Sequence, residues 1–161
     1  MKNKMPVVLI HNGCHEYLKT AIKQASKFND VVLIGDTNPE LNIKNFSFVD
    51  IKGFWKGCEE FAENYIHLNT TSVPYETFCF QRWIVLRNFM EKNNVEIVFH
   101  IDSDVLLFVD VNKEWFKYEQ YDMTLVHRSA GTSIFIKSGI LGDYCNFFAN
   151  TYKSTNSYAF K

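Results

Sequence analysis

Two short apolar runs, separated by one helical stripe, constrain the fold of this 161-residue chain most strongly. Residues 7–10 and 31–34 consist only of Val, Leu and Ile, as expected of strands that are buried on both faces of a parallel sheet. Between them, residues 14–28 place apolar side chains at helical spacing. Strand, helix and strand within about thirty residues form a βαβ unit, whose strands run parallel through a right-handed crossover. The sequence therefore predicts an α/β fold with a mostly parallel sheet flanked by helices.

The rest of the chain continues this alternation. Further strands are predicted at residues 46–50, from residue 95 onward, at 121–127 and at 132–136. Further helices are predicted at residues 57–68, 77–92, 112–118 and 138–152. Residues 1–152 are expected to form one domain, and residues 153–161 a polar tail.

Composition narrows the class of protein. A hydrophobic fraction of 47% with 16% aromatic residues is typical of a globular protein and not of a disordered one. The net charge of −1, without a run of Lys or Arg, argues against a nucleic-acid surface and a polybasic membrane patch. No apolar segment approaches the length of a transmembrane helix or of a signal-peptide core. The four cysteines are scattered, as expected of small reduced core residues in a cytoplasmic protein.

Two carboxylates, Asp102 and Asp104, follow the apolar strand that begins at residue 95. Alternate side chains of a strand point to the same face, so His100, Asp102 and Asp104 would share a face if the extended conformation persisted. Two neighbouring carboxylates repel each other, and a divalent cation is the usual way to relieve this. Ligands of open α/β sheets gather beyond the carboxyl ends of the strands. We therefore expect a metal or ligand site here, and a solvated strand terminus is the alternative.

A guanidinium lies on the apolar face of the predicted helix at residues 77–92. On a helical wheel, Arg82 falls in the middle of that face, whereas Gln81 falls opposite. A buried guanidinium keeps its charge and needs an anionic or hydrogen-bonding partner. The partner is expected to be a site carboxylate or a ligand, or else Asp50 or Glu76 in an internal ion pair.

Two polar residues, His11 and Asp36, each come just after a predicted buried strand. A nucleotide base or ribose could lie at these positions, and a turn-capping role is the alternative for each. The chain contains no Gly-x-Gly-x-x-Gly, P-loop or Gly-x-Ser-x-Gly motif. Among its five histidines, no pair is predicted to act as zinc ligands at helical spacing.

Taken together, these residues resemble the GT-A class of glycosyltransferases. The resemblance is closest to a group of bacterial sugar transferases in which a Phe-Cys-Phe-x-Arg-Trp helix precedes the Asp-x-Asp strand. Here residues 78–83 are Phe-Cys-Phe-Gln-Arg-Trp, and residues 101–105 are Ile-Asp-Ser-Asp-Val. Residues 34–36 and 65–69 also resemble segments of that group, so the similarity spans most of the chain.

The resemblance implies a GT-A fold and a metal-dependent glycosyltransferase. Such an enzyme moves a sugar from a nucleotide-diphosphate donor, here most simply a UDP-sugar, to a glycan or lipid-linked acceptor. By the resemblance, Asp104 would ligate Mn²⁺ or Mg²⁺ directly. Asp102 would bind ribose or sugar hydroxyls, or the metal through water. A hard cation on carboxylates suits this chemistry because negative charge builds up on the leaving diphosphate.

The resemblance also assigns the donor site and a location. Arg82 would reach the donor sugar, His11 and Asp36 would line the nucleoside pocket, and Ser103 would belong to the nucleotide-sugar site. The protein would be cytoplasmic, either free or attached peripherally at the inner face of the membrane.

GT-A enzymes usually continue well beyond the Asp-x-Asp motif, whereas this chain ends at Lys161. We therefore expect a donor-binding half, a naturally short protein or a decayed one, and no catalytic base can be named. One alternative is a nucleotide-sugar-binding fragment without activity. A second is a sugar-1-phosphate nucleotidyltransferase, although residues 11–14 do not resemble its Gly-rich loop. A third treats Asp102, Asp104 and Arg82 as an internal ion-pair cluster.

Overall fold

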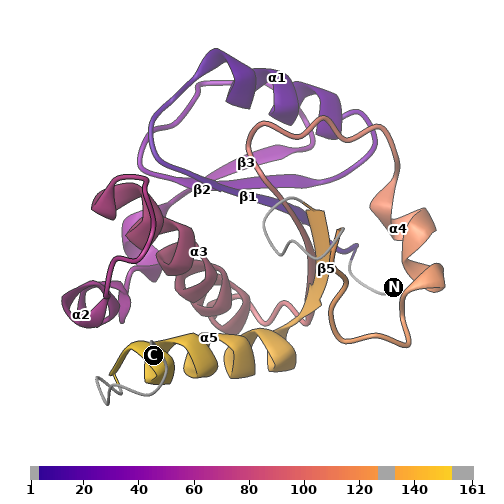
Figure 1. Cartoon of the computed structure of the whole chain (residues 1–161). Helices are drawn as coiled ribbons and strands as arrows, with labels where there is room; N and C mark the ends of the chain where they lie inside the picture. Colours follow the sequence, from indigo (N-terminus) through magenta and orange to yellow (C-terminus); the bar gives the residue numbers. More distant parts are fainter. Residues whose placement is uncertain (1–3, 127–132, 154–161) are drawn as a thin grey trace.

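The protein is built on a five-stranded sheet of order β3-β2-β1-β4-β5 (Figure 1). The computed structural model describes residues 4–126 and 133–153. Four strands run parallel, and the edge strand β5 runs antiparallel to β4. The strands are β1 (Val7–His11), β2 (Val31–Gly35), β3 (Phe46–Asp50), β4 (Ile97–Ile101) and β5 (Ser133–Lys137). The predicted α/β fold with a mostly parallel sheet is confirmed.

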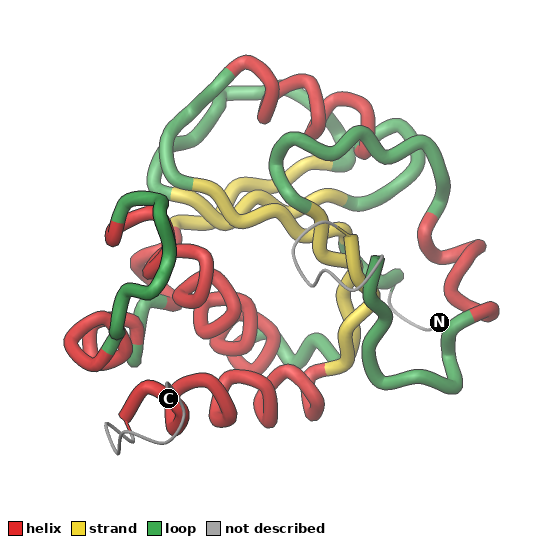
Figure 2. Tube along the Cα trace, in the orientation of Figure 1, coloured by secondary structure: helices red, strands yellow, loops and turns green. Residues whose placement is uncertain are grey.

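Helices cover both faces of this sheet (Figures 1 and 2). The α-helices are α1 (Glu16–Ala25), α2 (Cys58–Asn64), α3 (Val73–Lys92), α4 (Val111–Glu114) and α5 (Ser138–Lys153). Two 3₁₀ helices are η1 (Ile51–Phe54) and η2 (Trp115–Lys117). The first long helix, α1, lies on one face, and α3 with α5 lies on the other (Figure 2). No helix within the described ranges is both long and apolar enough to cross a membrane.

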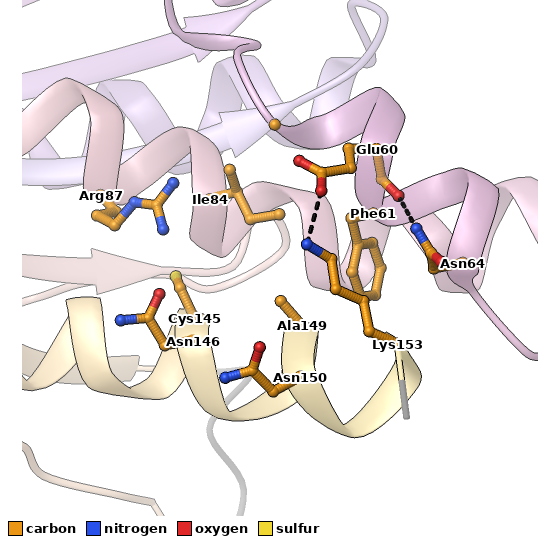
Figure 3. Close-up of a pocket in the computed structure, with 11 residues that line it drawn as sticks. Glu60, Phe61, Asn64, Ile84, Arg87, Cys145, Asn146, Ala149, Asn150 and Lys153 are labelled. Atoms are coloured by element: carbon orange, nitrogen blue, oxygen red, sulfur yellow. Dashed lines mark hydrogen bonds and ion pairs between the residues drawn. The ribbon is translucent and has the colours of Figure 1, made fainter. Parts of the chain in front are cut away.

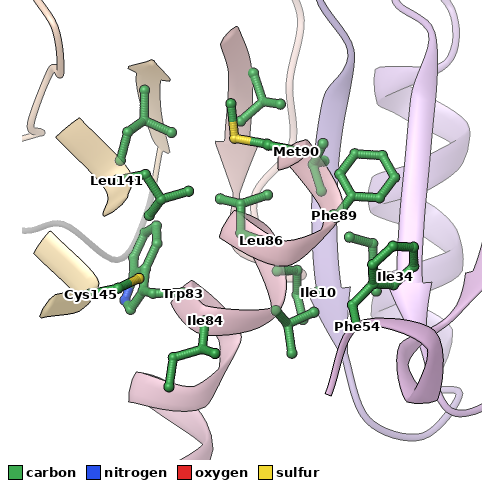
Figure 4. Close-up of a cluster of buried hydrophobic side chains, with 14 of the residues drawn as sticks. Ile10, Ile34, Phe54, Trp83, Ile84, Leu86, Phe89, Met90, Leu141 and Cys145 are labelled. Atoms are coloured by element: carbon green, nitrogen blue, oxygen red, sulfur yellow. The ribbon is translucent and has the colours of Figure 1, made fainter. Parts of the chain in front are cut away.

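The buried side chains form two clusters, one on each face of the sheet. Alternate strand residues enter different clusters, because successive side chains of a strand point to opposite faces. The α3 side includes Ile10, Ile34 and Trp83 (Figure 4), and the α1 side includes Leu9 and Leu33. Continuous apolar runs are needed in β1 and β2 because both faces are covered.

Two helices are shorter than the sequence predicts. The first helix begins at Glu16 with His15 as its N-cap, so the predicted start at residue 14 is wrong. The helix predicted at residues 57–68 ends at Asn64, whose side-chain amide donates to the Glu60 carbonyl at 2.7 Å. Such local hydrogen bonds compete with continuation of a helix.

The central helix α3 is longer than predicted, because it begins at Val73 and not at residue 77. Pro74 lies in its first turn, where a proline removes no intrahelical hydrogen bond. Gln81 was predicted on the exposed face, but it is 8% exposed and donates to the Cys58 carbonyl at 2.9 Å. This hydrogen bond joins α3 to the start of α2.

The predicted strand at residues 121–127 is wrong for the part that the structure describes. An isolated bridge joins Met123 to Ile136, and two backbone hydrogen bonds, Thr124 amide to Phe135 carbonyl and Lys137 amide to Asp122 carbonyl, accompany it at 3.0 Å each. The Phe135 amide donates to the Thr124 hydroxyl at 3.0 Å and not to a backbone carbonyl of this segment, so no regular ladder forms. His127 and the predicted tail from residue 154 onward lie outside the described residues. Residues 112–118, predicted as one short helix, are divided between α4 and η2.

The cysteine prediction is confirmed for two of the four thiols. Cys58 and Cys145 are buried, and burial raises the pKa of each thiol to about 12. Cys79 is partly buried, whereas Cys14 is exposed and so is not the core residue that the sequence predicts.

Candidate functional site

The strand order creates a topological switch point at the carboxyl edge of the sheet, between β1 and β4, and the region beyond these two strand ends is called the crevice below. From β1, the chain passes to β2 and β3 on one side, and then returns to place β4 on the other side of β1. Ligands of open α/β sheets bind at such a topological switch point, outside the carboxyl ends of the two strands. Here His11 ends β1, and Asp102 directly follows β4. The fold therefore brings these predicted site residues to one edge.

The two acids lie in a turn and not in a strand. The strand β4 ends at Ile101, and the Val105 amide donates to the Asp102 carbonyl at 3.1 Å, which closes a turn around Ser103 and Asp104. Asp104 is exposed, while Asp102 and Ser103 are half-buried. The extended conformation on which a shared face of His100, Asp102 and Asp104 depended does not persist, because β4 ends at Ile101 and the turn hydrogen bond follows.

Arg82 pairs with a site carboxylate. Its Nη1 atom lies 2.5 Å from Asp102 Oδ1, and the two side chains are only 17% and 23% exposed. The alternative partners are wrong, because Asp50 caps η1 and Glu76 accepts hydrogen bonds from the loop before α3. The Arg82 Nε atom is buried, and no hydrogen-bond partner for it lies within the described part of the chain.

Burial dominates the electrostatics beneath this ion pair. Burial raises the pKa of Asp102, the nearby negative charge of Asp104 adds to the rise, and Arg82 opposes it. His100 is 1% exposed, and burial together with the Arg82 charge lowers its pKa to about 3. Its Nδ1 atom lies 3.0 Å from the Val8 carbonyl, which can only accept, so Nδ1 carries the proton. His100 is thus a neutral core residue, and it also packs edge-on against Trp83 at a centroid distance of 5.0 Å.

The ends of β1 and β2 are held together on the other side of the crevice. Asp36 Oδ1 accepts from the Gly13 amide at 2.6 Å, which ties the loop after β1 to the loop after β2. A Cβ atom on Gly35 would lie 2.8 Å from the His11 carbonyl oxygen, so the strands approach too closely here for a larger residue. Asp36 therefore holds the neighbouring loop after β1 through this oxygen, and its predicted nucleoside and turn-capping roles stay predictions.

His11 is influenced by acids from both neighbouring strand ends, Asp36 after β2 and Asp104 after β4. Burial lowers the pKa of its imidazole, and so does the neighbouring His15, whereas the negative charges of Asp36 and Asp104 raise it. Both carboxylates therefore lie within electrostatic reach of one imidazole. The structure thus brings Asp36, after β2, and Asp104, after β4, within electrostatic reach of His11 at the end of β1.

Sequence reasoning missed two aromatic neighbours of His11. His15 and Tyr17 stack with a centroid distance of 5.1 Å and an interplanar angle of 19°. His11 meets both rings edge-on, and its Nε2 atom lies 3.0 Å from His15 Nδ1. The prediction placed both residues inside a helix that starts too early, which hid the position of His15 at the strand–helix junction.

Sequence reasoning also missed Tyr75 and Cys79 on α3. The partly buried Cys79 is the main cause of the raised pKa of Tyr75, and the charges of Arg82 and Asp102 also act on that phenol. Positions 75, 79 and 82 are spaced four and three residues apart, so they share one helix face. That spacing was the available signal, and it extends the site along α3 to an exposed tyrosine.

The acid turn fits a hard divalent cation only if a ligand completes the coordination. No set of three or more His, Cys, Asp or Glu residues is arranged to hold a metal ion in the two described ranges. Mg²⁺ sites often use only one or two carboxylates and take their other ligands from water and substrate phosphates. Asp104 is exposed, and Asp102 uses only its Oδ1 atom in the bond to Arg82. These two acids would therefore hold Mn²⁺ or Mg²⁺ together with a phosphate ligand.

A separate pocket of about 180 Å³ lies between α2, α3 and α5 (Figure 3). The ion pair between Lys153 Nζ and Glu60 Oε1, at 2.6 Å, crosses it from α5 to α2, and Arg87 lies toward its other end. Its lining includes none of the residues predicted for the donor site.

No protein-family model, curated protein or solved structure matches this chain. The functional argument therefore rests on the geometry at the carboxyl edge of the sheet.

Proposed function

We propose that this chain binds a nucleotide-diphosphate sugar through a divalent cation, as part of a metal-dependent glycosyltransferase of the GT-A class. The observation that carries the proposal is the acid turn of Asp102 and Asp104 at the switch point between β1 and β4. An exposed carboxylate at this position is available to a ligand, because its side chain is not needed to fill the core. The proposed donor is a UDP-sugar, and the proposed acceptor is a glycan or a lipid-linked sugar.

Different residues around the crevice would bind different parts of such a donor. Mn²⁺ or Mg²⁺, when bound, would supply positive charge against the diphosphate, with Asp104 and Asp102 as its protein ligands. Arg82 uses Nη1 for Asp102, which is itself a proposed metal ligand. Its other terminal N–H groups can therefore donate to the donor sugar or to a phosphate beside the metal. Ser103 lies between the two acids and can donate its hydroxyl to the same ligand.

The opposite side of the crevice suits a nucleoside. The exposed ring of Tyr17, stacked on His15, offers a flat aromatic surface on which a base can stack. Asp36 uses one carboxylate oxygen for the Gly13 amide, and its other oxygen can accept from a ribose hydroxyl. His11 contacts the Tyr17 ring edge-on and is within electrostatic reach of Asp104, so it would neighbour both the base and the diphosphate of such a donor.

Calorimetry tests the proposal directly. UDP and GDP are titrated into the protein with and without Mn²⁺, and at least one of them is expected to bind only when the metal is present. Asp104→Ala should weaken that affinity about tenfold or more, because it removes a metal ligand. Asp143→Ala, which removes an exposed carboxylate from α5, is the matched control and should bind as the wild type does. Metal-independent binding, no binding by a folded sample, or equal affinities in Asp104→Ala and the wild type would refute the proposal.

A second candidate is a nucleotide-sugar-binding module that does not transfer the sugar. Among the site carboxylates that the structure describes, Asp36 bonds to the Gly13 amide and Asp102 bonds to Arg82. Asp104 is the remaining acid, and the proposal already uses it as a metal ligand. No site carboxylate within the described ranges is then left to act as a catalytic base, as expected of a module that binds the donor without transferring the sugar. Incubation with a UDP-hexose and Mn²⁺ distinguishes the two candidates: donor binding without release of free sugar or UDP favours the module, and release favours the enzyme.

A further inference from the structure

Two imidazoles meet at the rim of the crevice in a geometry that neither the fold nor the proposed donor site requires. His11 Nε2 and His15 Nδ1 lie 3.0 Å apart. His11 is the last residue of β1 and His15 is the N-cap of α1, so each ring is carried by the end of a regular element. Stacking on Tyr17 further restricts His15.

The nitrogen separation is close to that of two ligands of one metal ion. Two imidazole nitrogens that each lie about 2.0–2.1 Å from a tetrahedral Zn²⁺ are separated by about 3.3 Å. To bind one ion, the two nitrogens would move apart by a few tenths of an ångström, and the rings would turn so that both lone pairs point at the ion. Without a metal, one ring donates its N–H to the other, and a change of tautomer in that ring frees both nitrogens as ligands.

We propose that His11 and His15 form a two-imidazole site for a borderline transition metal ion, with Zn²⁺ as the ion of choice. Imidazole suits Zn²⁺, Cu²⁺ and Ni²⁺, whereas carboxylates suit Mg²⁺ and Mn²⁺, so this site differs in chemistry from the acid turn. The inference goes beyond the proposed function and does not depend on it.

The surroundings of the pair favour a cation. The carboxylates of Asp36 and Asp104 act electrostatically on His11, and their negative charges attract a divalent ion to this rim. The described residues supply no third His, Cys, Asp or Glu ligand in place, so water completes the coordination shell. Such a shell leaves open positions that an exogenous ligand can occupy.

Titration of the intact chain with Zn²⁺ alone, and separately with Ni²⁺ alone, tests the inference without any nucleotide. One ion per chain should bind, and His11→Gln and His15→Gln should each weaken binding about tenfold or more, because each removes one of two protein ligands. His67→Gln is the matched control and should leave binding unchanged. Circular dichroism of each variant separates loss of a ligand from loss of the fold.

Two further variants identify the ligands. Cys14 is exposed and lies between the two histidines in the sequence, so Cys14→Ser must retain the ion if the imidazoles hold it. Asp104→Ala must also retain most of the affinity, since it removes only an electrostatic contribution. Binding that follows Cys14 or Asp104 instead of the histidines, or no saturable binding to the folded wild type, would overturn the inference. Failure of the nucleotide titrations with Mn²⁺ would leave it standing, so the two proposals fail separately.

Discussion

The buried floor and the open rim of the crevice differ in how their charged groups are satisfied. The buried floor consists of Arg82, Trp83, His100 and Asp102. The open rim consists of His11, His15, Tyr17, Asp36 and Asp104. In the floor, an ion pair with side chains 17% and 23% exposed lies beside a neutral histidine and a buried tryptophan. In the rim, charged and aromatic groups face solvent, and Asp104 is exposed.

This difference shows which polar residues maintain the fold and which remain available to a ligand. Arg82 and Asp102 balance each other's charge where water is largely excluded, so removing either one leaves an uncompensated group. The rim residues His15, Tyr17 and Asp104 are exposed, and their removal costs little folding free energy. Changes in the floor should therefore act mainly on stability, and changes in the rim mainly on binding.

The largest expected effect is that of Arg82→Met. The substitution leaves Asp102 half-buried without its cation, so the free energy of unfolding should fall by about 2–3 kcal/mol, somewhat less than for a fully buried pair. Urea unfolding followed by circular dichroism measures this loss. A loss below about 0.5 kcal/mol would place the pair in effectively aqueous surroundings and would contradict the distinction between floor and rim.

The double variant Arg82→Met with Asp102→Leu sharpens the same point. Replacing both partners of a buried pair with apolar residues is often nearly neutral, so the double variant should recover most of the lost stability. A double-mutant cycle isolates the coupling between the two side chains. Additive losses would mean that the two residues contribute independently.

The second effect is a pH dependence that originates in the floor. His100 has a pKa of about 3 in the folded protein, against an ordinary value of 6.5 in the unfolded chain. Between these values the unfolded chain binds a proton that the native protein does not, so acid favours unfolding. The contribution of neutral His100 to the free energy of unfolding is fully present above pH 6.5. It is lost by about 1.4 kcal/mol per pH unit as the pH falls toward 3.

Urea unfolding at pH 7, 6 and 5, on the wild type and on His100→Leu, measures this contribution. The difference between the two pH slopes isolates His100, because other titrating groups are common to both proteins. Parallel slopes would show that His100 is not held neutral in the core.

The sequence predicts the floor better than the rim, and the reason is physical. Continuous apolar runs in β1, β2 and β4 require burial on both faces, and a guanidinium on an apolar helix face requires an anion. Both requirements are local, so Arg82 and the acids after β4 could be recognised. Which acid partners Arg82 depends on where β4 ends, and a single turn hydrogen bond from the Val105 amide to the Asp102 carbonyl decides that.

The rim depends on contacts between residues that are distant in the sequence. The hydrogen bond from the Gly13 amide to Asp36 joins loops 23 residues apart, and it accompanies the late start of α1 at Glu16. Helical periodicity does not encode that late start, since Cys14 and Leu18 continue the same stripe. The proximity of His11, His15 and Tyr17 therefore could not be read from local pattern.

The third effect tests the rim through binding. If a base stacks on Tyr17, Tyr17→Ala should weaken Mn²⁺-dependent nucleotide affinity about fivefold, or about 1 kcal/mol, at the lower end of stacking energies. Tyr121→Ala, which removes another exposed tyrosine, is the matched control and should not change the affinity. Calorimetry with UDP or GDP measures both variants. Equal losses in the two variants, or none in Tyr17→Ala, would remove this ring from the nucleoside position.

The smallest effect should come from Asp104→Asn, and it completes the comparison with Asp102. The carboxylate is exposed, and its charge contributes to the raised pKa of Asp102, which indicates repulsion between the two acids. Neutralising it should therefore change the free energy of unfolding by no more than about 0.5 kcal/mol, in the stabilising direction. Asp102→Asn, in contrast, should destabilise the protein because it weakens the bond to Arg82. Urea unfolding of both variants measures these changes. If Asp104→Asn lowers the free energy of unfolding by more than about 1 kcal/mol, this acid has a structural role, and its exposure no longer supports a ligand role.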